Sequence, residues 1–180
     1  MSVFYFAYGS NMQRATFRGR RDVRPLSAVA ARLPGWRLVL DKPPLLPMRQ
    51  SFANVVPDAA AVCWGVLYEL TEDDHAHVEL TEAVPFGNYR RVEVEVHPLG
   101  DGAASRVALT LTSERRDPDL RPSVRYVGLM IQGAEEHGLP EGWIRHLRGI
   151  PAMEECAEDL ALRAELDALM RAVARRRPEE

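Results

Sequence analysis

Alternating apolar and polar residues predict β-strands over most of the first two thirds of the chain. In residues 89–98, valines at positions 92, 94 and 96 alternate with charged side chains, which is typical of a strand with one face in water. Residues 106–112 have a similar pattern and are expected to pair with that strand across Gly100-Asp101-Gly102. Further strands are predicted to end at Tyr8, to flank a turn at Pro34-Gly35 within 26–40, and to occupy 52–56 and 61–70 on either side of Pro57-Asp58.

The spacing of apolar residues becomes helical toward the end of the chain. Thr71 precedes Glu72-Asp73-Asp74, the pattern of an N-cap with carboxylates in the first turn, so a short helix is expected over 72–80. Helical spacing begins again at Ser123 and stops at Gly138, and Pro140 is expected to start another short helix. Strands first and helices afterwards predict an α+β fold rather than repeated β-α-β units.

The last segment, residues 154–175, has an apolar stripe along one helical face. Leu162, Leu166, Leu169 and Val173 form this stripe, and charged residues flank it. Because an isolated helix of this length is only marginally stable, the stripe must pack on its own domain, the simpler arrangement, or on a second subunit of a homodimer. We expect a domain over 1–150, followed by an amphipathic helix and a frayed tail over 151–180.

Composition narrows the class of protein. The chain has 180 residues, of which 46% are hydrophobic, and this is enough for one domain with a sizeable core. A net charge of −3 argues against nucleic acid as a partner. No apolar run is long enough to span a membrane, so we expect no membrane contact and a cytoplasmic location. The two cysteines, Cys63 and Cys156, lie far apart in the sequence, which favours buried thiols over a disulfide or a metal site.

The first candidate site is the turn after the first strand. An aromatic stretch over residues 5–8 leads directly into Gly9-Ser10-Asn11. Gly9 is expected to adopt a positive φ and to let another molecule approach the main chain. Backbone N–H groups in such a turn can bind an anion or a developing oxyanion. The alternative is an ordinary strand that ends in a tight turn.

Three further stretches are interpreted from their residue types. Asn11 is expected to cap a short helix that begins at Gln13. The proline-rich loop over residues 41–50 excludes regular structure and is expected to flank a pocket. An arginine cluster is too polar for a core and is interpreted as solvated surface; it consists of Arg18, Arg20, Arg21 and Arg24.

Four stretches, in the same order along the chain, resemble the γ-glutamylcyclotransferase family. They are YGSN at 8–11, VCWGVLYEL at 62–70, ELTEAVPFGNYRRVEVEV at 79–96 and PSVRYVGLMIQGAEEHGLPEGW at 122–143. The resemblance covers roughly residues 3–148. It implies the fold of that family, a mixed, barrel-like β-sheet with short flanking helices, to which this chain adds a C-terminal helix.

The resemblance also implies an activity and a set of site residues. The family carries an acid/base glutamate between a helix and a strand that bears a tyrosine, and these positions correspond to Glu82 and Tyr89. Glycine commonly follows that glutamate, whereas Ala83 and then Pro85-Phe86 stand here, which leaves the specificity of this rim open. The implied reaction is cleavage of a γ-glutamyl amide by the substrate's own α-amine, with release of 5-oxoproline and a free amine and with no metal or organic cofactor. The remaining residues that the resemblance assigns to the substrate pocket are Tyr5, Phe6, Ala7, Tyr8, Gly9, Ser10, Asn11 and Tyr126.

Several alternatives stay open at this level. The same chemistry could remove a γ-glutamyl protecting group from a larger biosynthetic amine, and a catalytically silent binding module could retain the same pocket. Ser10 lacks the G-x-S-x-G setting of a nucleophilic serine. His75 and His77 would point in different directions on a helix, which makes them poor metal ligands. The resemblance implies a small γ-glutamyl compound as the partner.

Overall fold

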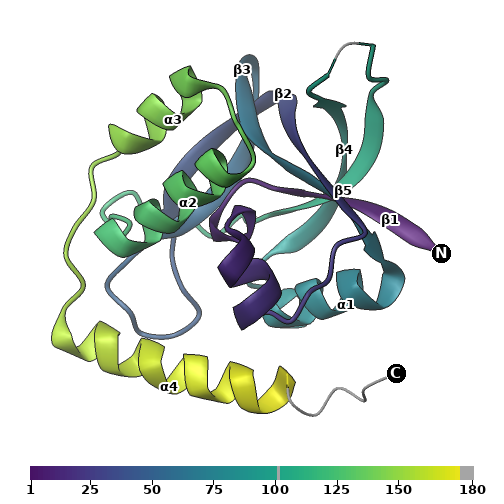
Figure 1. The fold of residues 1–180 in the computed structure, drawn as a ribbon. Helices are drawn as coiled ribbons and strands as arrows, with labels where there is room; N and C mark the ends of the chain where they lie inside the picture. The colour runs from purple at the N-terminus through teal and green to yellow at the C-terminus, as the bar shows by residue number, and fades with distance from the viewer. Residues whose placement is uncertain (101, 175–180) are drawn as a thin grey trace.

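A five-stranded closed barrel forms the centre of the molecule (Figure 1). The structure is a computed structural model that describes residues 1–100 and 102–174, with side chains described as far as residue 169. The strand order is β1-β3-β2-β4-β5; β1 runs parallel to β5 where the barrel closes, and all other neighbouring strands are antiparallel. The strands are β1 (Ser2–Ala7), β2 (Ser27–Lys42), β3 (Phe52–Thr71), β4 (Arg90–Pro98) and β5 (Arg106–Thr112). The predicted α+β fold with a mixed, barrel-like sheet is confirmed.

The two longest strands continue through positions where the sequence indicated turns. β2 and β3 form one antiparallel hairpin, whose register shifts between Pro34 and Trp36. Gly35, at this irregularity, has a φ of +78°, and Pro57 stands opposite Trp36 on β3. The prediction that turns divide both strands is therefore wrong. The prolines and the glycine instead mark a bulge, which bends a continuous strand as a barrel requires.

Short helices surround the barrel at the predicted positions. The Asp74 N–H donates to Thr71 Oγ1 at 3.0 Å, so the N-cap expected at Thr71 is present. Ser123 caps α2 in the same way, because its Oγ accepts from the Tyr126 N–H at 3.2 Å. Pro140 precedes the third helix, as expected. The helices are α1 (Glu72–Thr81), α2 (Val124–Glu136), α3 (Glu141–Arg148) and α4 (Ala157–Ala174), and the short 3₁₀ or π-helical turns are η1 (Ser10–Met12), η2 (Ala15–Arg20) and η3 (Val84–Phe86).

The segment after β1 differs from the prediction. Asn11 does not cap a helix at Gln13; it is the middle residue of η1, and η2 follows with Arg14 at its N-cap. The Asn11 side chain is buried and hydrogen-bonds to Glu82 and Arg21. Asn11 therefore does not stabilise a helix end. It holds two side chains that the fold brings together from distant parts of the sequence.

Helix α2 packs directly against the main chain of η1. A Cβ added at Gly133 would lie 2.5 Å from the backbone nitrogen of Gln13 and 2.6 Å from the carbonyl carbon of Met12. Only glycine allows the helix to approach the turn so closely. The contact fixes Tyr126, on the same helix, relative to the turn after β1.

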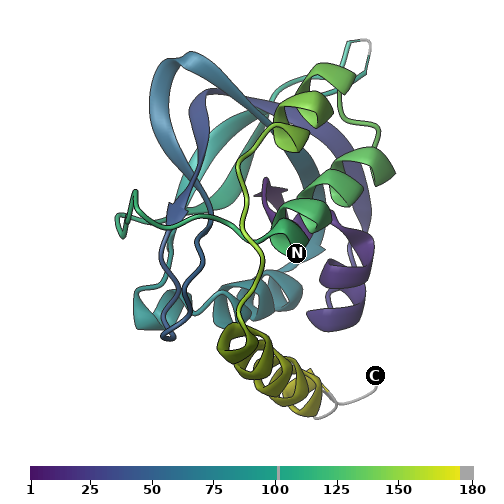
Figure 2. The ribbon, with the colours of Figure 1, turned by 90° about the vertical axis from the view of Figure 1, so that its left-hand side faces the viewer.

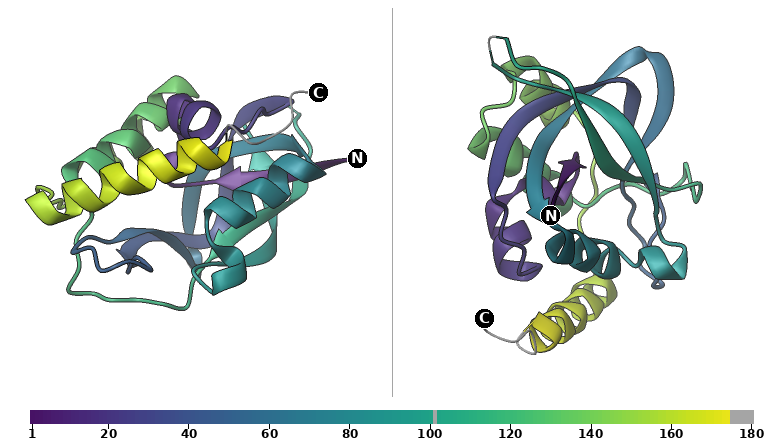
Figure 3. Two further views of the ribbon diagram at one scale, coloured as in Figure 1. Left: turned by 90° about the horizontal axis from the view of Figure 1, so that it is seen from below. Right: turned by 90° about the vertical axis from the view of Figure 1, so that its right-hand side faces the viewer.

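Helix α4 lies outside the barrel, below η2 and α1 in the view of Figure 1, and Figure 2 and the right panel of Figure 3 show the same separation from other sides. Asp167 of α4 forms an ion pair with Arg20 of η2 at 2.7 Å. At the start of the helix, the Asp159 carboxylate accepts a hydrogen bond from the Arg49 N–H at 3.0 Å. Helix α4 is thus joined to its own chain at both of these points.

The apolar stripe of α4 is only partly covered. Leu162 and Leu166 are half-buried, whereas Leu169 is 61% exposed. The side chain of Val173 and the predicted frayed tail at 175–180 lie outside the described residues. Homodimer formation through this face stays an untested prediction.

The two cysteines differ in their surroundings. Cys63 is buried in β3, but Cys156, just before α4, is only half-buried, and both thiols are free. The prediction of a core thiol is therefore confirmed for Cys63 and wrong for Cys156, because the segment that carries Cys156 lies outside the barrel. Among the described helices, none is long and apolar enough to cross a membrane.

Candidate active site

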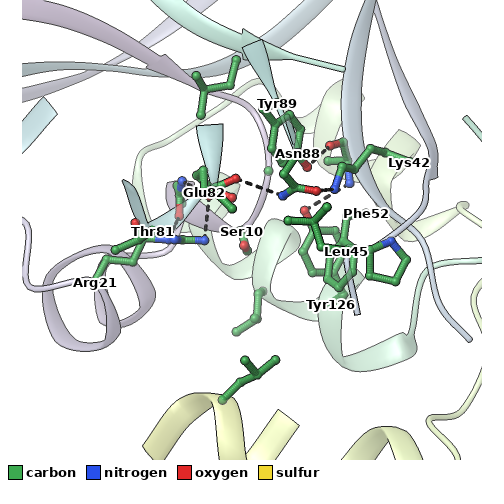
Figure 4. A pocket seen from close by; sticks show the side chains of 18 of the residues that line it. Ser10, Arg21, Lys42, Leu45, Phe52, Thr81, Glu82, Asn88, Tyr89 and Tyr126 are labelled. Atoms are coloured by element: carbon green, nitrogen blue, oxygen red, sulfur yellow. Dashed lines mark hydrogen bonds and ion pairs between the residues drawn. The ribbon is translucent and has the colours of Figure 1, made fainter. Parts of the chain in front are cut away.

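A cavity of about 330 Å³ opens at one end of the barrel, between η1, η2, α1, α2 and α4. Most of the residues predicted for the site line this cavity, although they come from segments far apart in the sequence (Figure 4). The predicted residues that line it are Tyr5, Tyr8, Gly9, Ser10, Asn11, Glu82, Tyr89 and Tyr126. The proline-rich loop flanks the cavity as expected, through residues such as Pro44 and Leu45.

Phe6 and Ala7 are the two predicted residues that the structure does not place at the cavity. Both are buried in the core, and the Phe6 ring lies so close to Gly65 that a Cβ there would be 2.8 Å from its Cζ atom. Successive side chains of a strand point to opposite faces, so the residue after Tyr5 points away from the face that Tyr5 presents to the cavity. Ala7 shares the face of Tyr5, but it is buried against Gly65, whose added Cβ would lie 2.2 Å from the Ala7 carbonyl oxygen. The expectation that Phe6 and Ala7 form the pocket is corrected for both residues.

Glu82 is held in a closed ring with Asn11 and Arg21. Arg21 Nη2 lies 2.6 Å from Glu82 Oε1, and Asn11 Nδ2 donates to the same oxygen at 2.8 Å. Arg21 Nε donates to Asn11 Oδ1 at 2.6 Å, which completes the ring. No hydrogen bond within the described part of the chain uses the second carboxylate oxygen, Oε2. The ring thus fixes one oxygen of the carboxylate and leaves the other available in the cavity.

The end of α1 sets the position of Glu82. Its N–H donates to Val78 O at 2.9 Å as the last helical bond, and its carbonyl oxygen accepts from Asn88 Nδ2 at 2.9 Å. Ala83 then adopts a left-handed conformation, with φ 56° and ψ 38°. This residue reverses the chain into η3 at the position where the resembling family commonly carries glycine.

Replacing Ala83 by glycine should stabilise the protein by about 1 kcal/mol, because a left-handed conformation is strained for any residue with a Cβ. Urea denaturation of the purified variant would measure the change. Ala161→Gly, at an exposed position within α4, is the matched control and should cost about 1 kcal/mol instead. Destabilisation by both changes would show that the Ala83 conformation carries no strain.

Lys42 is a second buried charge beside the cavity. Its ammonium group hydrogen-bonds to Asn88 Oδ1 and lies 4.5 Å from the centre of the Tyr89 ring. Burial, together with the nearby Arg115 charge, lowers the pKa of Lys42 to about 8. Asn88 therefore links Lys42 to the main chain of Glu82, as Figure 4 shows.

Two tyrosines bind the main chain of one residue of β3, Ala53. The Tyr89 hydroxyl donates to Ala53 O at 2.9 Å, and the Ala53 N–H donates to the Tyr126 hydroxyl at 3.2 Å. The Tyr8 hydroxyl similarly donates to the carbonyl oxygen of Leu111. Burial raises the pKa of all three tyrosines, so they stay neutral and form a rigid wall.

Gly9 has a φ of −109°, so the expectation of a positive φ is wrong. Space explains the glycine instead, because an added Cβ would lie 3.0 Å from the Tyr126 hydroxyl oxygen and 3.3 Å from the Ala53 Cβ. Glycine here allows the turn after β1 to touch the tyrosine wall.

Gly9→Val should lower both stability, by about 1–3 kcal/mol, and turnover, because the larger side chain must displace Tyr126. Urea denaturation and an activity assay on the same preparation would measure the two effects. Gly19→Ala is the control, since an added Cβ at Gly19 meets no atom within 4 Å. Wild-type behaviour of Gly9→Val would show that this contact is unimportant.

Sequence reasoning missed several charged residues of the site. Arg20 and Arg21 were interpreted as solvated surface, yet both line the cavity, and Arg21 is only 9% exposed. Lys42, Arg125 and Arg163 also line it without having been singled out. One signal was available in the sequence. Several arginines follow the YGSN turn within about ten residues, so the chain between them is too short to carry these arginines far from the turn. Within the described residues, no group of His, Cys, Asp and Glu side chains is arranged to hold a metal ion.

Comparison with known proteins agrees with this geometry. The model of the AIG2-like family matches residues 62–147. γ-Glutamyl cyclotransferase gliK of Claviceps purpurea is 32% identical over 148 residues, covering 78% of this chain and 66% of that protein. The chain belongs to the γ-glutamylcyclotransferase (AIG2-like) family. The resemblance seen in the sequence is thereby confirmed.

Other relatives of this γ-glutamylcyclotransferase-family protein come from a fungus and a mammal. γ-Glutamyl cyclotransferase aclK of Aspergillus oryzae is 28% identical over 170 residues, covering 81% of this chain and 60% of that protein. The γ-glutamylcyclotransferase of Bos taurus is 27% identical over 155 residues, covering 83% of this chain and 79% of that protein. The chain thus spans between three fifths and two thirds of the length of the fungal relatives.

Solved structures support the fold. One described as a γ-glutamyl cyclotransferase has a TM-score of 0.73 at 21% identity, covering 92% of this chain and 99% of that chain. YkqA from Bacillus subtilis has a TM-score of 0.67 at 24% identity, covering 84% of this chain and 56% of that chain. At these identities the likeness concerns the fold, so the reaction has to be argued from the site.

Proposed function

We propose that the protein is a γ-glutamylcyclotransferase that cleaves a small γ-glutamyl amide and releases 5-oxoproline and a free amine. The observation that carries this proposal is the Glu82 carboxylate, fixed at one oxygen by Arg21 and Asn11 and open at the other toward the cavity. A cavity of about 330 Å³ suits a ligand of the size of a γ-glutamyl dipeptide. Names of relatives that belong to the family point to the same reaction.

The reaction needs no external nucleophile. The α-amine of the substrate attacks its own γ-carbonyl carbon, so a new C–N bond closes the five-membered ring while the original amide C–N bond breaks. One proton leaves the attacking nitrogen and one is delivered to the leaving nitrogen, so the overall proton count is unchanged. Folding the substrate into a ring-closing geometry supplies much of the rate enhancement, because the attack is intramolecular.

Glu82 is the residue to which we assign both proton transfers. Its Oε2 can accept a proton from the attacking amine and return it to the leaving amine. Arg21 and Asn11 act as positioning residues that stop the carboxylate from rotating away. The main chain of Gly9 and Ser10 lines the same cavity and can meet the negative charge that develops on the γ-carbonyl oxygen.

The tyrosine wall gives this chemistry a fixed frame. Because Tyr89 and Tyr126 both bind the main chain of Ala53, β3, α2 and the residue directly before β4 are held together at the cavity. A preorganised site avoids rearrangement during the reaction, which is how fixed polar groups stabilise a transition state. A catalytically silent module has no need of a charged, oriented carboxylate in this frame.

Incubation of the purified protein with a panel of γ-glutamyl compounds, followed by mass spectrometry of 5-oxoproline, tests the proposal. The panel should contain γ-glutamyl amino acids, γ-glutamyl polyamines and a γ-glutamyl aminoglycoside, so that a protecting group on a larger amine is also covered. Time-dependent 5-oxoproline together with an equal amount of free amine is the expected result. Absence of both products across the panel would support the silent binding module instead.

A further inference from the structure

The cavity is lined by far more positive than negative charge. Glu82 is the only carboxylate among the described lining residues, although the chain as a whole carries a net charge of −3. Such an imbalance in a confined site attracts anions. The cationic lining residues are Arg20, Arg21, Lys42, Arg125 and Arg163.

Some of these cations already have carboxylate partners. Arg21 is paired with Glu82, and Arg163 Nε lies 3.1 Å from Glu155 Oε1. Arg125 is different: it forms no ion pair or hydrogen bond with any residue in the described part of the chain, although it is half-buried. A guanidinium group has five N–H donors whose geometry matches a carboxylate, so Arg125 can bind an anionic group of a ligand.

Arg20 repeats this pattern in part. Its Nη2 pairs with Asp167, but its Nε is buried and has no hydrogen-bond acceptor within the described residues. Burial lowers the pKa of Arg20, and the neighbouring positive charges of Arg21 and Arg125 add to this effect. Burial likewise lowers the pKa of Arg125, with Arg163 as the next cause. The guanidinium groups thus lie close enough to repel one another, and a bound anion would relieve that repulsion.

The unpaired donors lie near α4, whereas Lys42 lies near the end of α1. The charges that act on Arg125 come from Arg163, Glu155 and Asp167, all on α4 or the segment before it. Lys42, in contrast, senses Glu82 and is bound to Asn88, next to the end of α1. A γ-glutamyl group placed with its amine at Glu82 can therefore direct its own α-carboxylate to Lys42. The leaving amine then extends toward Arg125.

We propose that Arg125, together with Arg20 and Arg163, selects a leaving amine with a negatively charged side chain, so that the preferred substrate is the γ-glutamyl derivative of an acidic amino acid. This inference rests on the proposed cyclotransferase function. An acidic amino acid adds a side-chain carboxylate to the leaving group, and the Arg125 guanidinium, which lines the cavity, is the donor that we assign to it. Arg163 lines the cavity from α4. This helix lies outside residues 62–147, which the family model matches, so part of the proposed selectivity comes from a segment beyond the matched region.

Non-reactive analogues test this selectivity separately from catalysis. Glutaryl-L-glutamate and glutaryl-L-glutamine have the same shape and lack the α-amine, so neither can cyclise. Calorimetry of wild-type protein should give roughly tenfold tighter binding of the glutamate analogue, as expected for a charge-assisted contact. Equal binding of the two analogues would overturn the inference, whatever the outcome of the turnover assay.

Variants identify the residues responsible. Arg125→Gln should reduce the preference for the glutamate analogue over the glutamine analogue to about twofold or less. Arg163→Gln, on helix α4, should also reduce this preference. It replaces Arg125→Gln as the test if that variant does not fold. Arg145→Gln removes the same charge from an exposed position on α3 and should leave the preference at its wild-type value. If the preference for the glutamate analogue is unchanged in both cavity variants, Arg125 and Arg163 do not select the ligand. If the wild-type protein forms no 5-oxoproline from any substrate of the panel, the proposed reaction is rejected, whereas the binding preference is judged by calorimetry alone.

Discussion

Glu82→Gln should lower the rate of 5-oxoproline formation by about 10² to 10⁴ while leaving the protein folded. Glutamine has nearly the same volume and keeps an oxygen that can accept from Arg21 and Asn11, but an amide cannot carry a proton between two nitrogens. Single-turnover measurement of 5-oxoproline and thermal unfolding of the same sample would report the two properties.

Glu79→Gln provides the matched control for this prediction. Glu79 lies one turn earlier on α1, where its carboxylate pairs with Arg91 at 3.3 Å, and it does not line the cavity. This variant should retain turnover close to that of the wild type. If Glu79→Gln abolished turnover and Glu82→Gln kept normal turnover, Glu79 would be the acid/base and our assignment of Glu82 would be refuted.

Arg21→Gln should lower the free energy of unfolding by about 2–4 kcal/mol and also reduce turnover. The side chains of Arg21 and Glu82 are only 10% and 17% exposed, so removing one partner leaves the other charge buried without compensation. The variant also releases Asn11 Oδ1, which loosens the whole ring. Urea denaturation monitored by tryptophan fluorescence would measure the stability change.

A double-mutant cycle separates the ion pair from other effects of Arg21. Adding Glu82→Gln to Arg21→Gln removes the uncompensated carboxylate, so the double variant should be more stable than the sum of the single changes implies, by about 1 kcal/mol or more. The exposed pair between Arg37 and Asp58 is the control, and Arg37→Gln should cost less than about 1 kcal/mol. Strict additivity at Arg21 and Glu82 would mean that the pair contributes no coupling.

The sequence was sufficient for the elements that depend on local signals. Helix α1 was predictable because Thr71 and Asp74 form a cap within four consecutive residues, and β4 because its valines alternate without interruption. The bulge at Pro34 and Pro57 was not predictable. Whether a proline ends a strand or merely bends it depends on its partner strand, and the register of β2 with β3 is a property of the folded barrel.

The same distinction applies to the site. The positions of Glu82, Tyr89 and Tyr126 followed from family resemblance, and the structure brings them to one cavity. Arg21 was missed because, apart from the density of arginines after the YGSN turn, nothing in the sequence shows that its partner Glu82, distant in the sequence, faces it. Phe6 was misplaced for a simpler reason, since the resemblance assigned a whole strand to the pocket although only one of its faces can meet it.

The turn that carries Gly9, Ser10 and Asn11 is among the first parts of the chain to be synthesised, yet Arg21, Glu82 and Tyr126, which it contacts at the cavity, come later. β1 pairs with β3 from Ser2 opposite Thr71, and it meets β5 through Tyr5 and Leu109. Contacts between such distant residues form late, after the long intervening segments have been ordered. On the ribosome, the residues of β1 therefore lack their strand partner until β3 has emerged, and the cavity is complete only once α2 and α4, which also line it, have been synthesised.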